Sequence, residues 1–444
     1  MKIFPLLKKA RKFIFNSMWI LSENILRLFV GFFVGVYVAR YLGPDEFGVY
    51  NYCLAILTIL TPILKLGLDN ILVKEFVNRH HEKNDTIKTG VILKGGMALA
   101  LSFLLFTIYY LTSSYNILLI SIMSIGYIFQ SFEVFGFYYQ SIHENKKITQ
   151  CKLVQLLFSS ILKLVAIHLN CSIIVFVWLY SIDLITLYIA LYLFYQNDHE
   201  KIKWREIPFS SEKSIKLVRE SWPFILSGVA GLIYMRADQI MIKNMLGDSA
   251  VGEFSAAVRL SEIIYMIPNM LLLVLFPVIT KIFNENKERY IFIVRRLFDL
   301  MVFIAWLMII PISLLSKYII DLLYGAQYAG AAQILTAHVF CALFVFIGIA
   351  NSAWVVNEKL GKITLLRTLL AAFLNITLNI YLIPTYGAVG AAYATCISQF
   401  MASIGLNVLT KSTRPWFYRQ IVSLLTFGFG LFKIVSAGKY EKSL

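Results

Sequence analysis

The sequence predicts an all-α protein that crosses a lipid bilayer about twelve times, in two lobes of six helices each, with both termini in the cytoplasm. The first observation is composition: 59% of the 444 residues are hydrophobic and 15% are charged, whereas soluble domains carry about 25% charged residues. Mean hydropathy is +0.73. The other two observations are the recurrence of long apolar runs and the alternation of basic loops between them.

Apolar runs close to the ~20 residues that a membrane helix needs recur along the whole chain. They lie at residues 17–38, 49–69, 89–111, 116–137, 149–169, 172–195, 220–243, 250–280, 292–315, 331–355, 363–385 and 387–410. These runs leave no room for a large water-soluble catalytic domain. A further apolar stretch, 416–435, is interrupted by Arg419 and Lys433, which favours an interfacial helix over a thirteenth span.

Basic side chains alternate between successive loops. The odd-numbered gaps between spans hold only Arg40, Lys243 and Lys317, whereas the even-numbered gaps are basic, the sixth holding Lys201, Lys203, Arg205, Lys213, Lys216 and Arg219. Because basic loops stay on the cytoplasmic side, this pattern predicts cytoplasmic termini. The excess of basic residues on these loops explains the net charge of +16. We therefore do not expect nucleic-acid binding.

The longest polar interior stretch divides the chain. We predict an N-terminal lobe at 1–196 with spans one to six, a cytoplasmic linker at 197–219, a C-terminal lobe at 220–410 with spans seven to twelve, and a tail at 411–444. Five cysteines have no paired spacing, so they are expected to be buried, reduced thiols: Cys53, Cys151, Cys171, Cys341 and Cys396.

An internal repeat supports the two lobes. Residues 42–50 and 246–254 share Leu-Gly, three variable positions, an apolar residue, Gly, one variable position and an aromatic residue. A weaker match joins residues 147–149 to 362–364, both Lys-Ile-Thr. Two matches at equivalent places favour a parallel repeat. Such repeats are typical of transporters with a substrate site at the repeat interface and alternating access.

Several stretches together resemble the bacterial O-antigen and polysaccharide flippases, the polysaccharide transporter branch of the multidrug/oligosaccharidyl-lipid/polysaccharide exporter superfamily. The resemblance covers nearly the whole chain. It is carried by residues 39–50, 221–223, 236–241, 251–260, 323–325 with Tyr328, 375–379, 382–384 and 387–392.

This resemblance implies a MATE-like fold and movement of an undecaprenyl-diphosphate-linked oligosaccharide, an O-antigen or similar lipopolysaccharide repeat unit. The direction implied is from the cytoplasmic to the periplasmic leaflet of the bacterial inner membrane. Expected partners are this substrate, membrane lipids and other glycan-assembly proteins.

Three alternatives remain. An ion-coupled multidrug exporter of the same superfamily generally lacks so cationic a core, and a lipid II flippase usually has two additional helices. A membrane-bound polysaccharide polymerase usually has a long periplasmic loop, which this sequence lacks. We therefore do not expect an enzyme.

Cations within the spans are the candidate substrate site, because a charge in hydrocarbon costs a few kcal/mol and a diphosphate needs cationic partners. The predicted substrate-binding residues are Arg27, Lys65, Arg236, Arg259 and Arg367. Alternatives remain open: Arg27 forms an ion pair with Glu23 one turn earlier, and Lys65 and Arg367 snorkel to the interface. Lys94 and Lys152, still nearer the cytoplasmic edge, are expected to be interface anchors.

Energy for transport must come from an ion gradient or from consumption of the product, because the sequence has no nucleotide-binding motif. No cofactor and no metal site are expected, and H⁺ or Na⁺ is the candidate coupling ion. The carboxylates placed to take up such an ion are Glu23, Asp183, Asp238 and Glu262.

Three of these expectations concern local geometry. Lys163 and Asp183 lie deep in consecutive spans and are expected to form a structural ion pair. A network of Arg236, Asp238, Arg259 and Glu262 is also considered, although Arg236 and Asp238 lie on different faces of one helix. Pro268 interrupts the long eighth span and is the candidate hinge, with ordinary kinked packing as the alternative.

Overall fold

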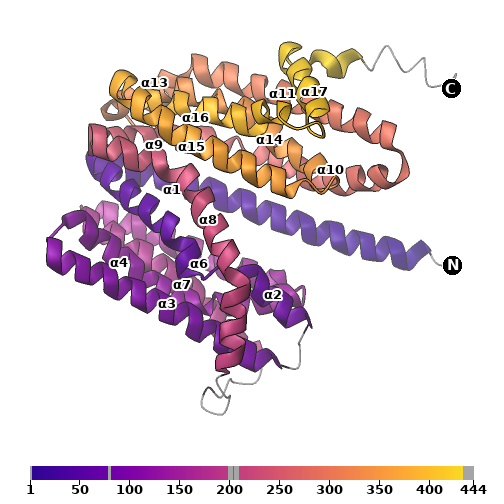
Figure 1. The fold of residues 1–444 in the computed structure, drawn as a ribbon. Helices are drawn as coiled ribbons and strands as arrows, with labels where there is room; N and C mark the ends of the chain where they lie inside the picture. The colour runs from indigo at the N-terminus through magenta and orange to yellow at the C-terminus, as the bar shows by residue number, and fades with distance from the viewer. Residues whose placement is uncertain (1–2, 79–81, 199–203, 205–209, 434–444) are drawn as a thin grey trace. The chain divides into compact units, whose positions relative to one another are not determined.

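The structure is a computed structural model that describes residues 3–78, 82–198, 204 and 210–433, with side chains described between Leu26 and Leu431. The described residues are overwhelmingly helical and contain no strand (Figure 1). The chain forms two compact units. The first comprises Met1–Leu42 and Cys53–Leu232, and the second comprises Gly43–Tyr52 and Ile233–Leu444.

The first unit contains the helices that the first six spans predict. Helix α1 is broken at Gly43, whose φ of 71° is unsuited to other residues, so the first two predicted spans are the two arms of one interrupted helix. The elements are α1 (Ile3–Leu64), α2 (Asp69–Asn78), α3 (Lys83–Thr112), α4 (Tyr115–Phe129), the 3₁₀ turn η2 (Gln130–Phe132), α5 (Glu133–Ser141), α6 (Asn145–His168) and α7 (Ile173–Asp198).

The second unit contains the remaining predicted spans. Helix α8 begins in the first unit and enters the second at Ile233. The predicted eighth span is two helices that meet near Tyr265, and the predicted tenth is a pair bent by 48°. The elements are α8 (Ser211–Leu246), α9 (Asp248–Ile263), α10 (Met266–Glu285), α11 (Lys287–Leu314), α12 (Ser316–Leu323), η3 (Ala326–Tyr328), α13 (Ala329–His338), α14 (Cys341–Val355), α15 (Gly361–Tyr386), α16 (Ala388–Ser403), η4 (Gly405–Val408), α17 (Arg414–Leu425) and η5 (Phe429–Lys433).

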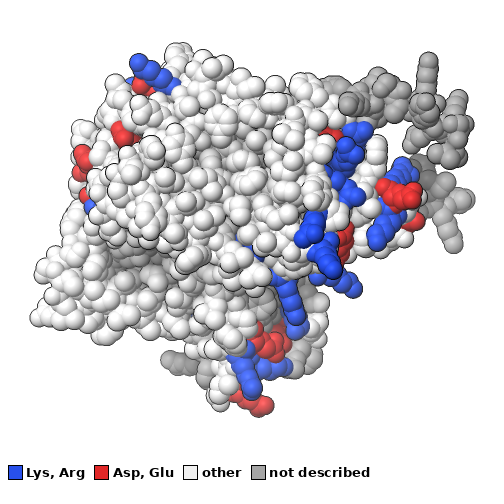
Figure 2. Space-filling view, turned by 45° about the horizontal axis from the view of Figure 1, so that its top comes forward, with Lys and Arg blue, Asp and Glu red and all other residues white. Residues whose placement is uncertain are grey.

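The helices suit a lipid bilayer. Ten helices of the described residues are long and apolar enough to cross a membrane, or eleven if the bent pair is one span. The first of them, Leu26–Asn78, has 53 residues and contains the break at Gly43, whereas one crossing needs ~20 residues. On the face shown in Figure 2, charged side chains gather near the edges of the view and leave a broad uncharged region between them. The protein is therefore a multi-pass membrane protein, as predicted.

The C-terminal helix α17 is not among the described helices that are long and apolar enough to cross a membrane. It has 12 residues, too few for a bilayer. Its Trp416 stacks on Trp354 of α14 with ring centroids 5.4 Å apart. The buried Gln420 donates a hydrogen bond to Asn351 Oδ1 at 2.6 Å. The helix is thus anchored to α14 in the core of the second unit.

The cysteine prediction is wrong for two of the five residues. Cys341 of α14 and Cys396 of α16 form a disulfide, with Cα atoms 4.6 Å apart. The other three cysteines form no disulfide among the described residues, and of these Cys171 is half-buried rather than buried. The pairing escaped prediction because 55 positions separate the two residues, and only the packing of two helices brings them together.

Candidate functional site

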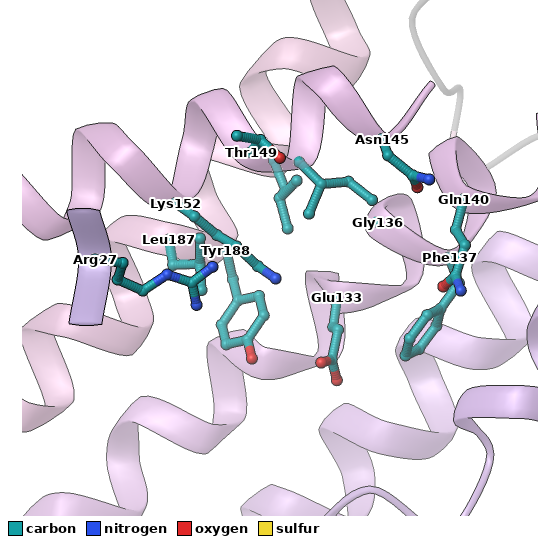
Figure 3. A pocket seen from close by; sticks show the side chains of 12 residues that line it. Arg27, Glu133, Gly136, Phe137, Gln140, Asn145, Thr149, Lys152, Leu187 and Tyr188 are labelled. Atoms are coloured by element: carbon teal, nitrogen blue, oxygen red, sulfur yellow. The ribbon is translucent and has the colours of Figure 1, made fainter. Parts of the chain in front are cut away.

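A cavity of about 350 Å³ lies within the first unit, a size at the lower end of ligand sites. Its wall comes from α1, α5, α6 and α7 (Figure 3). The lining residues are Arg27, Glu133, Gly136, Phe137, Gln140, Asn145, Ile148, Thr149, Lys152, Leu187, Tyr188 and Leu191. The cavity therefore combines cations, amides and hydroxyls with an apolar wall.

Two cations project into this cavity from different helices. Arg27 on α1 and Lys152 on α6 point into the same space beside Tyr188, with Glu133 across from them (Figure 3). Guanidinium and ammonium groups form strong hydrogen bonds with phosphate oxygens, and amides such as Gln140 and Asn145 suit sugar hydroxyls. The cavity is thus chemically suited to a phosphorylated sugar.

Lys152 was predicted to be an interface anchor; the structure places it in the cavity wall, and its position relative to the membrane interface stays a prediction. Arg27 also lines the cavity. The side chain of Glu23, its predicted ion-pair partner, lies outside the described residues. Whether Arg27 and Glu23 pair stays a prediction.

Four charged residues form a closed arrangement beside this cavity, here called the charged ring: Lys65, Asp69, Lys94 and Glu133. Lys65 Nζ lies 3.3 Å from Asp69 Oδ2 and 3.0 Å from Glu133 Oε1. Lys94 Nζ lies 2.9 Å from Asp69 Oδ1 and 3.0 Å from Glu133 Oε2. Each carboxylate oxygen therefore accepts from one ammonium group, and the ring is neutral.

The charged ring bears on two predictions, the interface anchoring of Lys94 and the snorkelling of Lys65. The side chain of Lys94 is only 2% exposed, so Lys94 is a buried ion-pair residue and not an interface anchor. Lys65 is 21% exposed and bound to two carboxylates, which argues against free snorkelling. Sequence reasoning missed Asp69 and Glu133. The sequence pattern that could have identified them is a carboxylate near the end of each of two predicted spans. Lys65 and Lys94, at a similar depth, each needed an acidic partner.

The predicted pair of Lys163 and Asp183 is present. Lys163 Nζ on α6 lies 2.6 Å from Asp183 Oδ2 on α7, and it also donates to Ser159 Oγ at 2.8 Å. Both side chains are partly exposed, at 21% and 17%. A role for Asp183 in ion coupling stays a prediction.

Asp238 on α8 is buried in the second unit among neutral hydrogen-bond donors. Asn379 Nδ2 of α15 donates to Oδ1 at 2.5 Å, and Thr395 Oγ1 of α16 donates to Oδ2 at 2.5 Å. Asn379 also donates to Asn375 Oδ1 at 3.2 Å. Among the described residues, no Lys, Arg or His forms an ion pair with Asp238. The carboxylate is thus held by neutral groups alone.

The predicted four-residue network stays a prediction, and the structure places Asp238 apart from the other three members. Glu262 of α9 experiences the positive charges of Arg236 and Arg259, whereas Asp238 faces α15 and α16. Arg236 is half-buried and Asp238 is buried, as expected for different faces of one helix.

Arg367 of α15 is a buried cation, only 4% exposed, so it does not snorkel. Its Nη2 donates to Thr364 Oγ1 at 2.9 Å, and its guanidinium lies 5.7 Å from the centroid of the Trp354 ring. Nε and Nη1 are buried without a hydrogen-bond partner among the described residues.

Pro268 lies in the first turn of α10, directly after the interruption near Tyr265. At this position its missing N–H breaks no helical hydrogen bond. The structure therefore has an interrupted helix where a hinge was predicted, and motion at this point stays a prediction.

Comparison with known proteins assigns the chain to a family. Residues 13–283, more than half of the chain, match the model of the family described as "Polysaccharide biosynthesis protein". The chain is 24% identical over 413 residues to the capsular polysaccharide biosynthesis protein CapF of Staphylococcus aureus, covering 89% of this chain and 98% of CapF. It is 23% identical over 418 residues to the probable flippase AglR of Haloferax volcanii, covering 88% and 82%.

A solved structure supports the fold. The lipid II flippase MurJ in an inward closed conformation superposes with a TM-score of 0.72 at 17% sequence identity, covering 96% of this chain and 99% of MurJ. The predicted MATE-like, all-α membrane fold is confirmed, and AglR and MurJ, to which the chain is similar, are described as flippases. The resemblance noted in the sequence is likewise confirmed, and the chain belongs to the polysaccharide biosynthesis protein family.

Proposed function

We propose that this protein is a flippase that moves an undecaprenyl-diphosphate-linked oligosaccharide, an O-antigen or similar repeat unit, across a bacterial inner membrane. Movement is from the cytoplasmic to the periplasmic leaflet, by alternating access through a cationic cavity. Family membership supports a substrate of polysaccharide biosynthesis, and relatives described as flippases support translocation of a lipid-linked glycan.

The observation that carries the proposal is the polar cavity of the first unit. A diphosphate linking a lipid to a sugar is negatively charged, and its passage through hydrocarbon requires cationic partners. Arg27 and Lys152 supply two such partners in one cavity of about 350 Å³. Gln140, Asn145 and Thr149 line the same cavity and suit the hydroxyls of the first sugar, whereas the polyprenyl tail remains in lipid.

Cations of the second unit extend the proposed binding set. Arg236 and Arg259 flank Glu262, and Arg367 has two buried donors without a partner among the described residues. In this proposal these arginines bind the diphosphate at a different stage of transport from Arg27. Glu262 balances their charge when no substrate is bound.

We further propose Asp238 as the residue that couples transport to a H⁺ or Na⁺ gradient. A buried carboxylate without a cation is unstable in a membrane protein, and a proton or a monovalent cation would neutralise it. The oxygen-rich surroundings suit Na⁺, because Asn375, Asn379 and Thr395 surround the carboxylate. The Oδ1 atom of Asn379 is buried without a hydrogen-bond partner in the part of the chain that the structure describes, so rotation of this amide would supply another oxygen ligand.

Complementation tests the proposed function. The gene is expressed in a flippase-deleted strain that carries the cognate glycan cluster, and surface polymer is scored by immunoblot. Restored polymer with the wild-type chain is the expected result. Resistance to cationic drugs without any glycan phenotype would favour the multidrug exporter, and rescue of a strain depleted of its lipid II flippase would favour that alternative.

A further inference from the structure

The charged ring lies directly behind the wall of the cavity described above. Glu133 and Phe137 both line the cavity, and both contact Lys94: its Nζ lies 3.0 Å from Glu133 Oε2 and 4.6 Å from the centroid of the Phe137 ring. Lys94 is thus separated from the cavity by two side chains. Of the four ring residues, Glu133 is the one that lines this cavity together with Arg27 and Lys152 (Figure 3).

The opposite side of the ring faces a second cavity of about 370 Å³, whose lining includes Lys65 and Asp69. The two carboxylates therefore differ in position although they share the same two lysines. Glu133 lies between the lysines and the cavity that we propose for the substrate, whereas Asp69 lines the other cavity together with Lys65.

A buried ammonium group must keep an anion beside it, because leaving it without one costs several kcal/mol. The Lys94 side chain is 2% exposed, so either Glu133 or another anion must remain beside it. Glutamate has three rotatable side-chain bonds, so its carboxylate can move while the backbone of α5 stays in place. An anion bound to Arg27 and Lys152 would repel that carboxylate and attract the lysines behind it.

We propose that the Glu133 carboxylate stands in for the second phosphate of a lipid diphosphate, and that substrate binding displaces it from Lys65 and Lys94. This inference rests on the proposed function. One phosphate binds Arg27 and Lys152, and the other takes the place of Glu133 on the ring. A lipid monophosphate engages only the first pair, so the ring selects diphosphates over monophosphates.

The test measures binding of farnesyl diphosphate and farnesyl phosphate to the full-length protein in detergent by isothermal titration calorimetry. Wild type should bind the diphosphate more tightly. Glu133→Gln removes the competing charge and should tighten diphosphate binding about tenfold, the value of one charge-assisted hydrogen bond, and leave monophosphate binding unchanged. Because Glu133→Gln also removes ion pairs of the ring, Glu133→Asp, which keeps the charge, is measured as a second variant. It should tighten diphosphate binding by less than Glu133→Gln does.

Asp69→Asn is the matched control, since it makes the same charge change on the other side of the ring. It should change diphosphate affinity less than about twofold, because Glu133 still covers both lysines in that variant. In a double-mutant cycle, Lys94→Gln should remove the preference for diphosphate and cancel the gain from Glu133→Gln.

Equal effects of Glu133→Gln and Asp69→Asn, or weaker diphosphate binding by Glu133→Gln, would overturn this inference. A wild-type protein that prefers diphosphate while both Glu133 variants bind it unchanged would overturn the inference and leave the proposed function standing. A wild-type protein that binds neither phosphorylated lipid would count against the proposed function itself.

Discussion

Gly48 and Gly252, the equivalent glycines of the internal repeat, each pack against the backbone of the other's segment. A Cβ atom on Gly48 would collide with the carbonyl of Asp248, and a Cβ atom on Gly252 would collide with the carbonyl of Pro44. The repeat motif therefore has a physical cause within the second unit: two segments cross so closely that neither tolerates a side chain at the crossing.

Replacement of either glycine should destabilise the protein. In Gly48→Ala and Gly252→Ala the clashing atoms belong to the backbone, so we expect a loss of about 3 kcal/mol, the upper end for overpacking. Thermal unfolding in detergent measures the change. Gly96→Ala is the control, because among the described residues no atom beyond its own turn of helix backbone lies within 4 Å of its Cβ position and alanine favours a helix interior. Equal melting temperatures for Gly48→Ala and Gly96→Ala would refute the close crossing.

Loss of a proposed substrate cation should abolish transport without loss of protein. Arg27→Ala and Arg259→Ala each remove a guanidinium from the proposed binding set, and we expect at least a tenfold fall in surface glycan, since one charge-assisted hydrogen bond is worth about that much. Immunoblots of surface polymer and of membrane protein measure both quantities. Lys281→Ala, whose side chain is 76% exposed, should behave as wild type. Wild-type activity in both arginine variants would exclude a cationic substrate site.

Asp238→Asn should uncouple transport from the ion gradient. The substitution keeps the size of the side chain and one acceptor oxygen for Asn379 or Thr395 but removes the charge that a cation would bind. Transport of lipid-linked glycan in vesicles with an imposed Na⁺ or H⁺ gradient measures coupling. Wild type should respond to one gradient and the variant to neither. If the variant keeps the full response, Asp238 is not the coupling residue, and another carboxylate must have that role.

Glu358 should make the stability of the second unit depend on pH. It lies between α14 and α15, and burial raises the pKa of its carboxyl above the ordinary value, against the opposing hydrogen bonds from Trp416 and Tyr290. Because the folded state favours the protonated form, this stabilisation is present at low pH and is lost as pH rises through the raised pKa. Glu358→Gln should match wild type in acid and unfold at a higher temperature at neutral pH. A constant difference across pH would contradict this assignment.

Hydrophobic pattern and helix geometry predicted much of the fold. Spans follow from apolar length alone, and the pair of Lys163 and Asp183 follows from two opposite charges at similar depth in consecutive helices. The separation of Arg236 from Asp238 follows from 3.6 residues per turn. These features depend on local spacing, which a sequence contains directly.

The charged ring was not predictable in the same way. Its members come from the end of α1 and from α2, α3 and α5, and Lys65 and Glu133 are 68 positions apart. Taken singly, Lys65 and Lys94 each look like lysines at a membrane edge. Only the packing of these helices shows that both share the same two carboxylates, and the disulfide of Cys341 and Cys396 escaped prediction for the same reason.

Direct measurement of flipping tests the central claim. Purified protein is reconstituted into vesicles that carry a fluorescent undecaprenyl-diphosphate oligosaccharide, and a membrane-impermeant quencher reports which leaflet holds it. Wild-type protein should exchange the lipid between leaflets far faster than empty vesicles or vesicles with Arg27→Ala. Exchange no faster than in empty vesicles, by a protein that is folded and competent to export drugs, would contradict the account.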